Sequence, residues 1–234
     1  SRTMSFVVSL SETSAQTVTV DIATADETAT VAGGDYTAAS ATLSFAPGVR
    51  TRTFDVTFSG DTQFETDEVF AVLLSSPVNA TLANSRATGT IANDDGVPTL
   101  AIGDVRVVEG AGVSTALFTV APSSPSGLAT TVGYATADDT AAVADGDYVS
   151  SAGTLTFVPG VVAQTVAVIV VGDRTFEPDE TFRVELAAAA GATIADGSAV
   201  GTIANDDALP VVDVADARTS EGDSGTSTLT FAVA

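Results

Sequence analysis

Acidic residues gathered in short, recurring motifs are the groups in this sequence best suited to chemistry. Asn93-Asp94-Asp95 and Asn205-Asp206-Asp207 place paired carboxylates side by side, and Phe64-Glu65 and Phe176-Glu177 add further ones. Carboxylate oxygens suit Ca²⁺, which takes about 6 to 8 oxygen ligands in flexible geometry, whereas Mg²⁺ keeps its waters and demands octahedral order. The motifs therefore favour calcium as the ligand.

The composition excludes most other kinds of site. With no His and no Cys, the chain has no imidazole or thiolate metal ligand, no Cys nucleophile and no Ser-His-Asp triad. Its 30 Asp and Glu outweigh 8 Lys and Arg, all of them Arg, and the net charge of −22 leaves nothing to neutralise nucleic-acid phosphates. We expect no enzymatic activity and no nucleic-acid partner. The longest apolar run, 161–171, is too short to cross a bilayer, so we expect no direct membrane insertion.

The acidic motifs belong to a repeat. Gly34-Asp35-Tyr36 returns as Gly146-Asp147-Tyr148, and the other motifs recur at the same distance of 112 residues. Glu109-Gly110 returns as Glu221-Gly222, so a third unit begins before the chain ends. We expect a first module over residues 1–96 that lacks its first strand, a complete second module over 97–208 and the start of a third over 209–234. Because both ends of the sequence fall inside a repeat unit, we interpret it as a segment taken from a longer array. The other possibility is a short complete protein whose ends complement each other between molecules.

Short runs rich in Val, Thr and Phe must position these motifs. In the second unit, alternation and turn signals such as Pro159-Gly160 predict strands over 99–108, 114–120, 130–135, 154–158, 164–171, 181–186 and 199–204. No segment has a helical period of adequate length. The prediction is an all-β fold of tandem immunoglobulin-like, seven-stranded antiparallel β-sandwiches.

The order of the strands sorts the acidic residues into one pole of each module. Connections in an antiparallel up-and-down path alternate between the two poles, so every second loop lies at the same pole. In the second unit the pole that holds the end of the last strand collects nine acids, and the opposite pole carries only Asp196. Clustered carboxylates repel unless a cation compensates them. The alternative is that they are solvated loop acids that serve solubility.

Five segments of the second unit resemble the Calx-beta module: Thr136–Ala141, Gly146–Tyr148, Gly153–Gly160, Gly172–Phe182 and Gly201–Asp207. The first unit matches over Thr24–Asp95, and Val107–Gly110 and Thr219–Gly222 match the opening of the module. Calx-beta modules are the calcium sensors of sodium-calcium exchangers and also occur in integrin β4 and in large bacterial surface proteins. The resemblance implies calcium ligands at Asp26, Asp61, Glu65, Glu68, Asp94 and Asp95 in the first unit, and at Glu109, Asp138, Asp173, Glu177, Glu180, Asp206 and Asp207 in the second.

Two departures from the exchanger module weaken the expected site. Asn93 and Asn205 stand where that module has the first of three consecutive Asp, and Gly60 and Gly172 stand where it has an acidic residue. Fewer carboxylates imply fewer ions or weaker binding.

The leading interpretation is a calcium-binding, non-enzymatic structural or adhesive repeat array of an extracellular, secreted or surface-bound bacterial protein or filament. Only Gly96-Val97 separates Asp94-Asp95 from Pro98 of the next module, so calcium at the acidic pole would also stiffen the module junction. The expected partners are calcium ions and neighbouring modules of the chain, together with like chains in a filament or a cell-surface ligand. The alternative is a pair of regulatory calcium-sensor modules of a transporter or larger enzyme.

Overall fold

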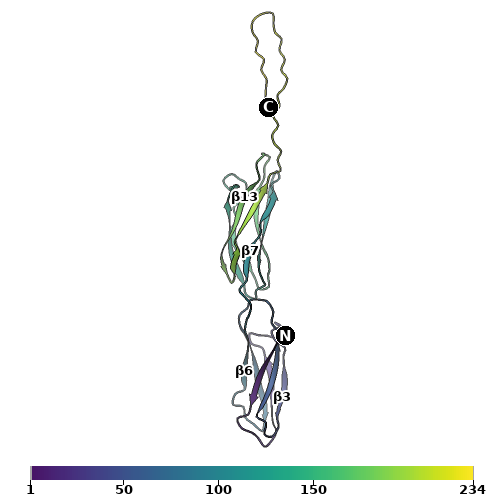
Figure 1. Cartoon of the computed structure of the whole chain (residues 1–234), viewed down its shortest axis with the longest axis vertical. Coiled ribbons are helices and arrows are strands. Elements are labelled where there is room, and N and C mark those ends of the chain that lie inside the picture. The colour runs from purple at the N-terminus through teal and green to yellow at the C-terminus, as the bar shows by residue number, and fades with distance from the viewer. Residues whose placement is uncertain (1, 234) are drawn as a thin grey trace.

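The computed structural model describes residues 2–233 and is built from strands. Two β-sandwiches follow one another along the long axis of the molecule, and the chain after residue 208 extends beyond the second sandwich as a long open loop (Figure 1). Within residues 2–233, no helix is long and apolar enough to cross a membrane. The predicted all-β, tandem-sandwich architecture is confirmed.

The second sandwich contains two sheets. Their strand orders are β11-β10-β13-β15-β8 and β12-β9-β7-β14. Alternate side chains of β12 are buried, as expected of a strand with one face on the core. The predicted strand over 164–171 is confirmed at both ends, and most others extend by a few residues. The bounds are β7 Thr99–Ile102, β8 Val105–Val108, β9 Val113–Pro122, β10 Thr130–Asp138, β11 Ala152–Phe157, β12 Gln164–Val171, β13 Glu180–Ala190, β14 Thr193–Asp196 and β15 Ser198–Ala204.

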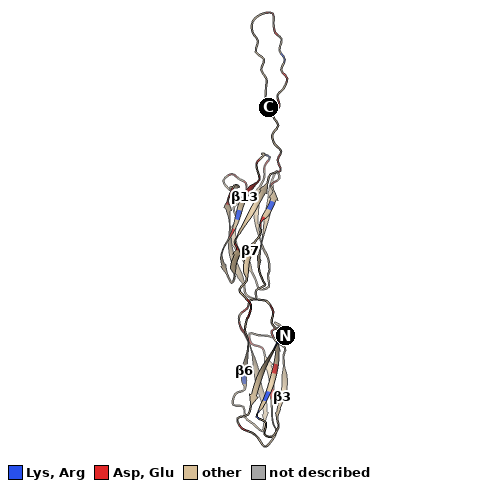
Figure 2. Ribbon diagram, in the orientation of Figure 1, with Lys and Arg blue, Asp and Glu red and all other residues tan. Residues whose placement is uncertain are grey.

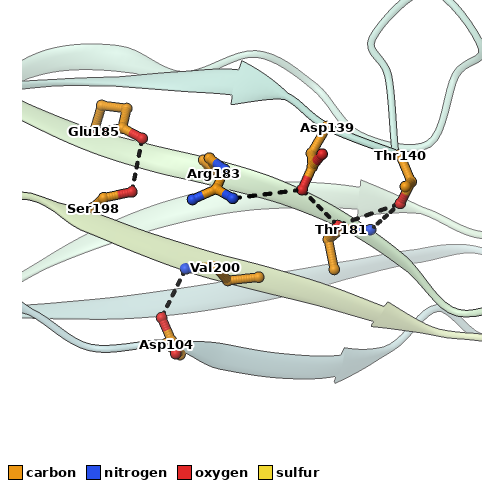
Figure 3. Close-up of polar contacts among 8 residues, drawn as sticks. All are labelled: Asp104, Asp139, Thr140, Thr181, Arg183, Glu185, Ser198 and Val200. Atoms are coloured by element: carbon orange, nitrogen blue, oxygen red, sulfur yellow. Dashed lines mark hydrogen bonds and ion pairs between the residues drawn. The ribbon is translucent and has the colours of Figure 1, made fainter.

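The first strand of this sandwich differs from the prediction. In place of one strand over 99–108 there are two, β7 and β8, which lie in different sheets and pair in parallel with β14 and β15. Between them Asp104 Oδ1 accepts a hydrogen bond from the Val200 backbone N–H at 2.8 Å, which holds the crossing against β15 (Figure 3). The sequence pattern did not predict β14, because its four residues form a strand only through their pairing with β7.

The first sandwich repeats this plan with fewer strands. Its sheets have the orders β3-β2-β5-β6 and β1-β4, and residues 2–96 contain no counterpart of β7, β8 or β14. The described part of this sandwich thus has six strands, with one sheet reduced to two. The bounds are β1 Arg2–Ser9, β2 Val18–Ala25, β3 Ser40–Phe45, β4 Thr51–Phe58, β5 Glu68–Val78 and β6 Arg86–Ile91.

Each core is organised around one phenylalanine of the longest strand. Tyr148 stacks on Phe182 with the ring centroids 4.6 Å apart, and Phe118 meets Phe182 edge-on at 5.8 Å. The neighbouring strand must carry a glycine here, because a Cβ at Gly201 would lie 2.5 Å from Phe182 Cζ. Phe70, with Tyr36, Phe6 and Gly89, repeats the arrangement in the first sandwich.

The loop after β10 is tied to the start of β13. The Thr181 backbone N–H donates to Thr140 Oγ1 at 2.7 Å, and Thr181 Oγ1 donates to Asp139 Oδ2 at 3.0 Å (Figure 3). Arg183 lies 3.9 Å from the same carboxylate. These contacts hold the loop at the end of the sandwich where the acidic residues collect.

Candidate metal centre

Glu109, Asp206 and Asp207 form one acidic group of the second sandwich, in which Glu109 is buried, Asp207 half-buried and Asp206 exposed. Glu109 follows β8 and the two aspartates follow β15, and because these strands pair in parallel their ends coincide. One carboxylate oxygen from each residue lies within 4.8 Å of the others. Glu109 is only 8% exposed, and its Oε1, like Asp207 Oδ2, is buried with no hydrogen-bond partner. Buried carboxylate oxygens without a donor are costly, so this group fits a cation.

A second acidic group lies at the same pole. Asp147, Glu177 and Glu180 each bring a carboxylate oxygen within 4.8 Å of the other two. Burial, followed by repulsion from Asp147, raises the pKa of Glu180 from 4.5 to about 7. The pKa of Glu109 is also raised, first by burial and then by the charge of Glu177, which shows that the two groups lie close enough to interact.

Asp147 is a member of this group that sequence reasoning missed. The Ala142 backbone N–H donates to Asp147 Oδ2 at 2.8 Å, and the carboxylate held in this way lies beside those of Glu177 and Glu180. Asp35 is its counterpart and accepts from the Thr30 N–H at 2.7 Å. A signal was present, since the acid stands inside the repeated Gly-Asp-Tyr motif.

Asp26 and Asp138 are each bound to a core tyrosine and lie outside the acidic groups. Asp138 Oδ1 accepts hydrogen bonds from the Tyr148 hydroxyl at 2.5 Å and from the Val143 N–H at 3.1 Å, and the tyrosine bond lowers the pKa of the carboxyl. Tyr36 makes the same contact with Asp26 at 2.6 Å. In this structure these two aspartates connect the core tyrosine to the loop and belong to neither acidic group.

Asp61 and Asp173 shape the loop before the longest strand. Asp173 Oδ1 accepts from the Thr175 N–H at 2.6 Å, and Asp61 accepts from the Gln63 N–H at 2.8 Å. Both are exposed. Both still act on the acidic residues nearby, because the charge of Asp173 contributes to the raised pKa of Glu109 and that of Asp61 to the raised pKa of Glu65.

The structure gives a physical reason for the asparagine of both sandwiches and for Gly172, whereas at Gly60 nothing lies within 4 Å of an added Cβ and packing does not explain the glycine. Asn205 Oδ1 accepts from the Glu177 N–H at 3.2 Å while its Nδ2 donates to the Asp207 carbonyl at 3.0 Å, and an aspartate could make only the first bond. Asn93 repeats this clamp. At Gly172, a Cβ would lie 1.9 Å from the Gly110 carbonyl oxygen, so an acidic side chain has no room there.

The first sandwich gathers its acids around a cavity of about 80 Å³. Burial is the main cause that raises the pKa of Glu65 and of Glu68, and repulsion from Asp61 and Asp35 adds to it. Residues 2–96 offer no counterpart of Glu109. The carboxylates that line the cavity are Asp35, Asp61, Glu65, Glu68, Asp94 and Asp95.

This cavity lies at the junction of the two sandwiches, where Figure 2 shows acidic loop segments. Phe64 forms a parallel bridge with Ser126 of the second sandwich, and its carbonyl accepts from the Gly127 N–H at 3.0 Å. A Cβ at Gly127 would lie 2.4 Å from Glu65 Oε1. The loop that carries Glu65 therefore packs directly against the next module.

Comparisons with known proteins agree with this picture. The Calx-beta domain family matches residues 1–96 and again 92–207. "Extracellular matrix protein 3" of Lytechinus variegatus is 28% identical over 186 residues, which cover 72% of this chain but only 6% of that protein.

Solved structures of similar fold were also found. The structure titled CBD12 from CALX1.2 is 20% identical with a TM-score of 0.42, covering 86% of this chain and 93% of its own. That of the calcium binding domain CBD12 of CALX1.1 is 24% identical with a TM-score of 0.39, covering 80% of this chain and 73% of its own. Because the two family matches together span nearly the whole chain, this protein belongs to the Calx-beta domain family.

Proposed function

We propose that this chain is a calcium-binding, non-enzymatic structural array in which the ion closes the acidic pole of each module. The observation that carries the proposal is the pair of buried, unpartnered carboxylate oxygens, Glu109 Oε1 and Asp207 Oδ2. No Lys exists in the chain to neutralise them. In the second module Glu109, Asp206 and Asp207 would hold one ion, and Asp147, Glu177 and Glu180 would hold or share another.

Calcium at the first pole should also stiffen the junction. Glu65 and Asp95 belong to the cavity, and Glu65 packs against Gly127 of the next module. Asp95 is three residues from the buried Pro98 of the second module. An ion bound between the loop that carries Glu65 and the linker that follows Asp95 would restrain both of these segments at the junction.

An extracellular or cell-surface setting is part of the proposal. The relative from Lytechinus variegatus bears the name of an extracellular matrix protein. The abundance of Ala, Thr and Gly and the absence of Lys favour a bacterial source, and the parent that we propose is a bacterial adhesin or filament. Its further partners would then be like chains or a cell-surface ligand.

Titration calorimetry with calcium, and with magnesium as control, tests the proposal. We expect saturable calcium binding and much weaker heats with magnesium. A melting experiment complements it, since a ligand at a hundredfold excess over its Kd stabilises by about 2.7 kcal/mol. Calcium should raise the melting temperature well beyond sodium at equal ionic strength. Equal shifts in the two salts would leave only screening and would refute the specific sites.

A further inference from the structure

The outward face of one sheet in the second sandwich is apolar and exposed. β9 and β12 pair antiparallel over eight residues each. Alternate residues of both strands point into the core, so the residues between them face outward. Four of these outward side chains are large and apolar, and they are 39% to 72% exposed: Val113, Leu117, Ile169 and Val171. The other outward residues of the pair are Thr115, Thr119, Thr165 and Ala167.

The apolar surface continues on both sides of this strand pair. Ala101 of β7 is exposed and lies opposite Ala121 of β9. On the other side, the Val149 backbone N–H donates to the Ile169 carbonyl at 2.9 Å, and the side chain of Val149 is 48% exposed. None of these outward positions carries a charge, although the chain has 30 Asp and Glu and 8 Arg. Asp196, beside Ala101 at the end of β14, lies at the rim. An apolar centre with a charged rim is the usual anatomy of a protein interface.

The same face of the first sandwich is polar. Three apolar residues have polar counterparts at the repeat distance of 112 residues: Leu117 and Ser5, Ala167 and Asp55, Ile169 and Thr57. Ser5 and Asp55 lie opposite each other on β1 and β4, and Ser5 Oγ donates to Asp55 Oδ1 at 2.6 Å. A charged, hydrogen-bonded pair thus occupies the place that Leu117 and Ala167 occupy in the second sandwich. The apolar face is therefore a property of the second module and does not follow from the strand pairing that both modules share.

The sheet is large enough for a weak dimer. Four strands spaced by about 4.8 Å, with eight residues that rise about 3.3 Å each, present a face of roughly 500 Å². Two such faces packed together would bury roughly 1,000 Å², which is the lower limit for a specific interface.

The charge of the chain favours a second copy as the occupant of this face. With a net charge of −22, two copies repel each other wherever their acidic loops meet. At the apolar face, two copies can approach without placing carboxylates opposite each other. The two faces also have the same twist, because they are the same sheet. Sheets of equal twist pack about 10 Å apart with their strands about 30° from parallel, as in a β-sandwich.

We propose that the outward face of β12, β9 and β7 packs against the same face of a second copy of this chain. The contact is isologous, so one patch serves both partners and the assembly closes as a dimer. Leu117 and Ile169 of each copy lie at its centre. The inference rests on the part of the proposed function that makes like chains partners, and it does not use the acidic groups of the poles.

Sedimentation equilibrium tests the assembly. In chelator, the mean mass should rise with concentration from that of one chain toward that of two. The triple variant Leu117→Ser, Ala167→Asp, Ile169→Thr gives the face the residues of the first sandwich, which folds with them on the same pair of strands. Its association should be weaker by roughly tenfold or more, because the two introduced carboxylates would be buried close together. A chain that stays monomeric at every concentration, or a triple variant that dimerises as before, would overturn the proposal.

Val7→Asp is the matched control. Val7 is 67% exposed on the corresponding face of the first sandwich, so this variant adds a carboxylate to an exposed strand outside the proposed interface. It should dimerise like the unmodified chain. If it lost dimerisation as completely as the triple variant, the contact would not be specific to the second sandwich and the proposal would fail.

Pyrene fluorescence locates the contact, since the natural chain has no cysteine. Pyrene attached to Thr115→Cys, on the outward face of β9, should give excimer emission that grows with concentration. Thr156→Cys places the label on β11, in the other sheet of the same sandwich, and should give none. A chain that dimerises without excimer emission from Thr115→Cys would contradict the proposal.

Salt and calcium distinguish this contact from others. Because both copies carry a net charge of −22, sodium chloride should screen their repulsion and strengthen an apolar contact. An interface held by ion pairs would weaken instead, and that result would count against the proposal. Dimerisation that needs calcium would also overturn it, because the contact would then lie at the acidic poles. Calcium binding is measured separately by calorimetry, so the failure of one proposal is distinguishable from the failure of the other.

Discussion

The two sandwiches are nearly the same structure with and without a first strand. In the second, β7 covers the core and β8 delivers Glu109 to the acidic pole. In the first, the described residues have neither strand, so the core opens into a groove and the pole lacks that carboxylate. β14 also has no counterpart in residues 2–96, but the tyrosine-phenylalanine stack and the asparagine clamp recur in both sandwiches. The two strands thus have separate roles, β7 in the core and β8 in the site.

The poles differ also in what lies beyond them. Phe64 is half-buried because it bridges to Ser126 of the following module. Its counterpart Phe176 is 43% exposed, with no sandwich after it in the described structure. The neighbour therefore restrains the first pole, whereas β8 restrains the second.

The largest expected effect is the loss of one site without the other. Glu177→Ala should weaken calcium binding in the second module by at least the 10- to 100-fold typical of a lost outer-shell partner, about 1.4 to 2.8 kcal/mol. Binding in the first module should be unchanged. Calorimetry would show the binding of the second module shifted to weaker affinity while that of the first module stays the same, and Asp206→Ala should behave alike.

Asp196→Ala is the matched control for that experiment. Asp196 ends β14, away from the acidic groups. If its loss weakened binding as much as the loss of Glu177, the assignment of the site to one pole would be wrong.

The tightness of the two cores can be compared with one substitution in each. Gly201→Ala forces a Cβ to within 2.5 Å of Phe182 Cζ, and overpacking of this kind costs about 1–3 kcal/mol. Gly89→Ala meets Phe70 at 2.4 Å, but the open groove beside Phe6 gives the first core room to yield. Urea denaturation should show the larger loss for Gly201→Ala. The opposite order would mean that the groove does not relieve the core.

Glu109→Gln should make the two poles more alike. The neutral amide removes a buried charge that Glu177, Asp206 and Asp207 repel, so the melting temperature in chelator should rise by a few degrees. Calcium affinity of the second module should fall several-fold, toward that of the first, because one anionic ligand is lost. A variant with unchanged affinity would show that Glu109 is no ligand.

Without calcium, the protonation of Glu180 should determine how the free energy of unfolding depends on pH. Its pKa is raised from 4.5 to about 7, so the native state binds more protons than the unfolded state within that window. The free energy of unfolding should therefore fall as pH rises from about 4.5 to about 7 in chelator. Glu180→Gln should make the melting temperature nearly independent of pH across this range. With calcium the slope should reverse, because the ion displaces the proton, and an unchanged slope would speak against coordination by Glu180.

The smallest effect is expected at the junction. Gly127→Ala pushes a methyl group against Glu65 and should widen the range of angles between the modules. Gly103→Ala is the control, since nothing lies within 4 Å of a Cβ there. Small-angle scattering with and without calcium measures the maximum dimension and its spread. If chelator and millimolar calcium gave the same profile for the unmodified chain, calcium would not stiffen the joint.

Much of the fold could be predicted because its signals are local. Alternation along β12 and the Pro-Gly turns depend only on neighbouring residues, and Pro47-Gly48 and Pro159-Gly160 recur at the distance of 112 residues. The split of the first strand could not be predicted, since it depends on the Asp104 contact with Val200, which are 96 residues apart. Parallel pairing has no sequence pattern of its own.

The sequence predicted at which pole the carboxylates lie, but not which of them group together. Loop order was enough to expect Glu109 near Asp206 and Asp207, and the structure places these three together. It was not enough to separate Asp147, which joins a group, from Asp138, which accepts a hydrogen bond from Tyr148. That distinction depends on side-chain direction inside a single loop. The bridge from Phe64 to Ser126 likewise depends on how two modules meet.

The parallel pairing of β8 with β15 bears on mechanical resistance. β8 lies near the start of the second module and β15 at its end, and their register runs from Gly201 opposite Val105 to Ala204 opposite Val108. A force that pulls the two ends of the module apart would slide these strands along each other. All the hydrogen bonds between them would then be in shear and would have to break together, whereas strands peeled from one end lose their bonds singly. An ion held between Glu109 and Asp206, just past the ends of both strands, would fasten the same pair and raise the rupture force.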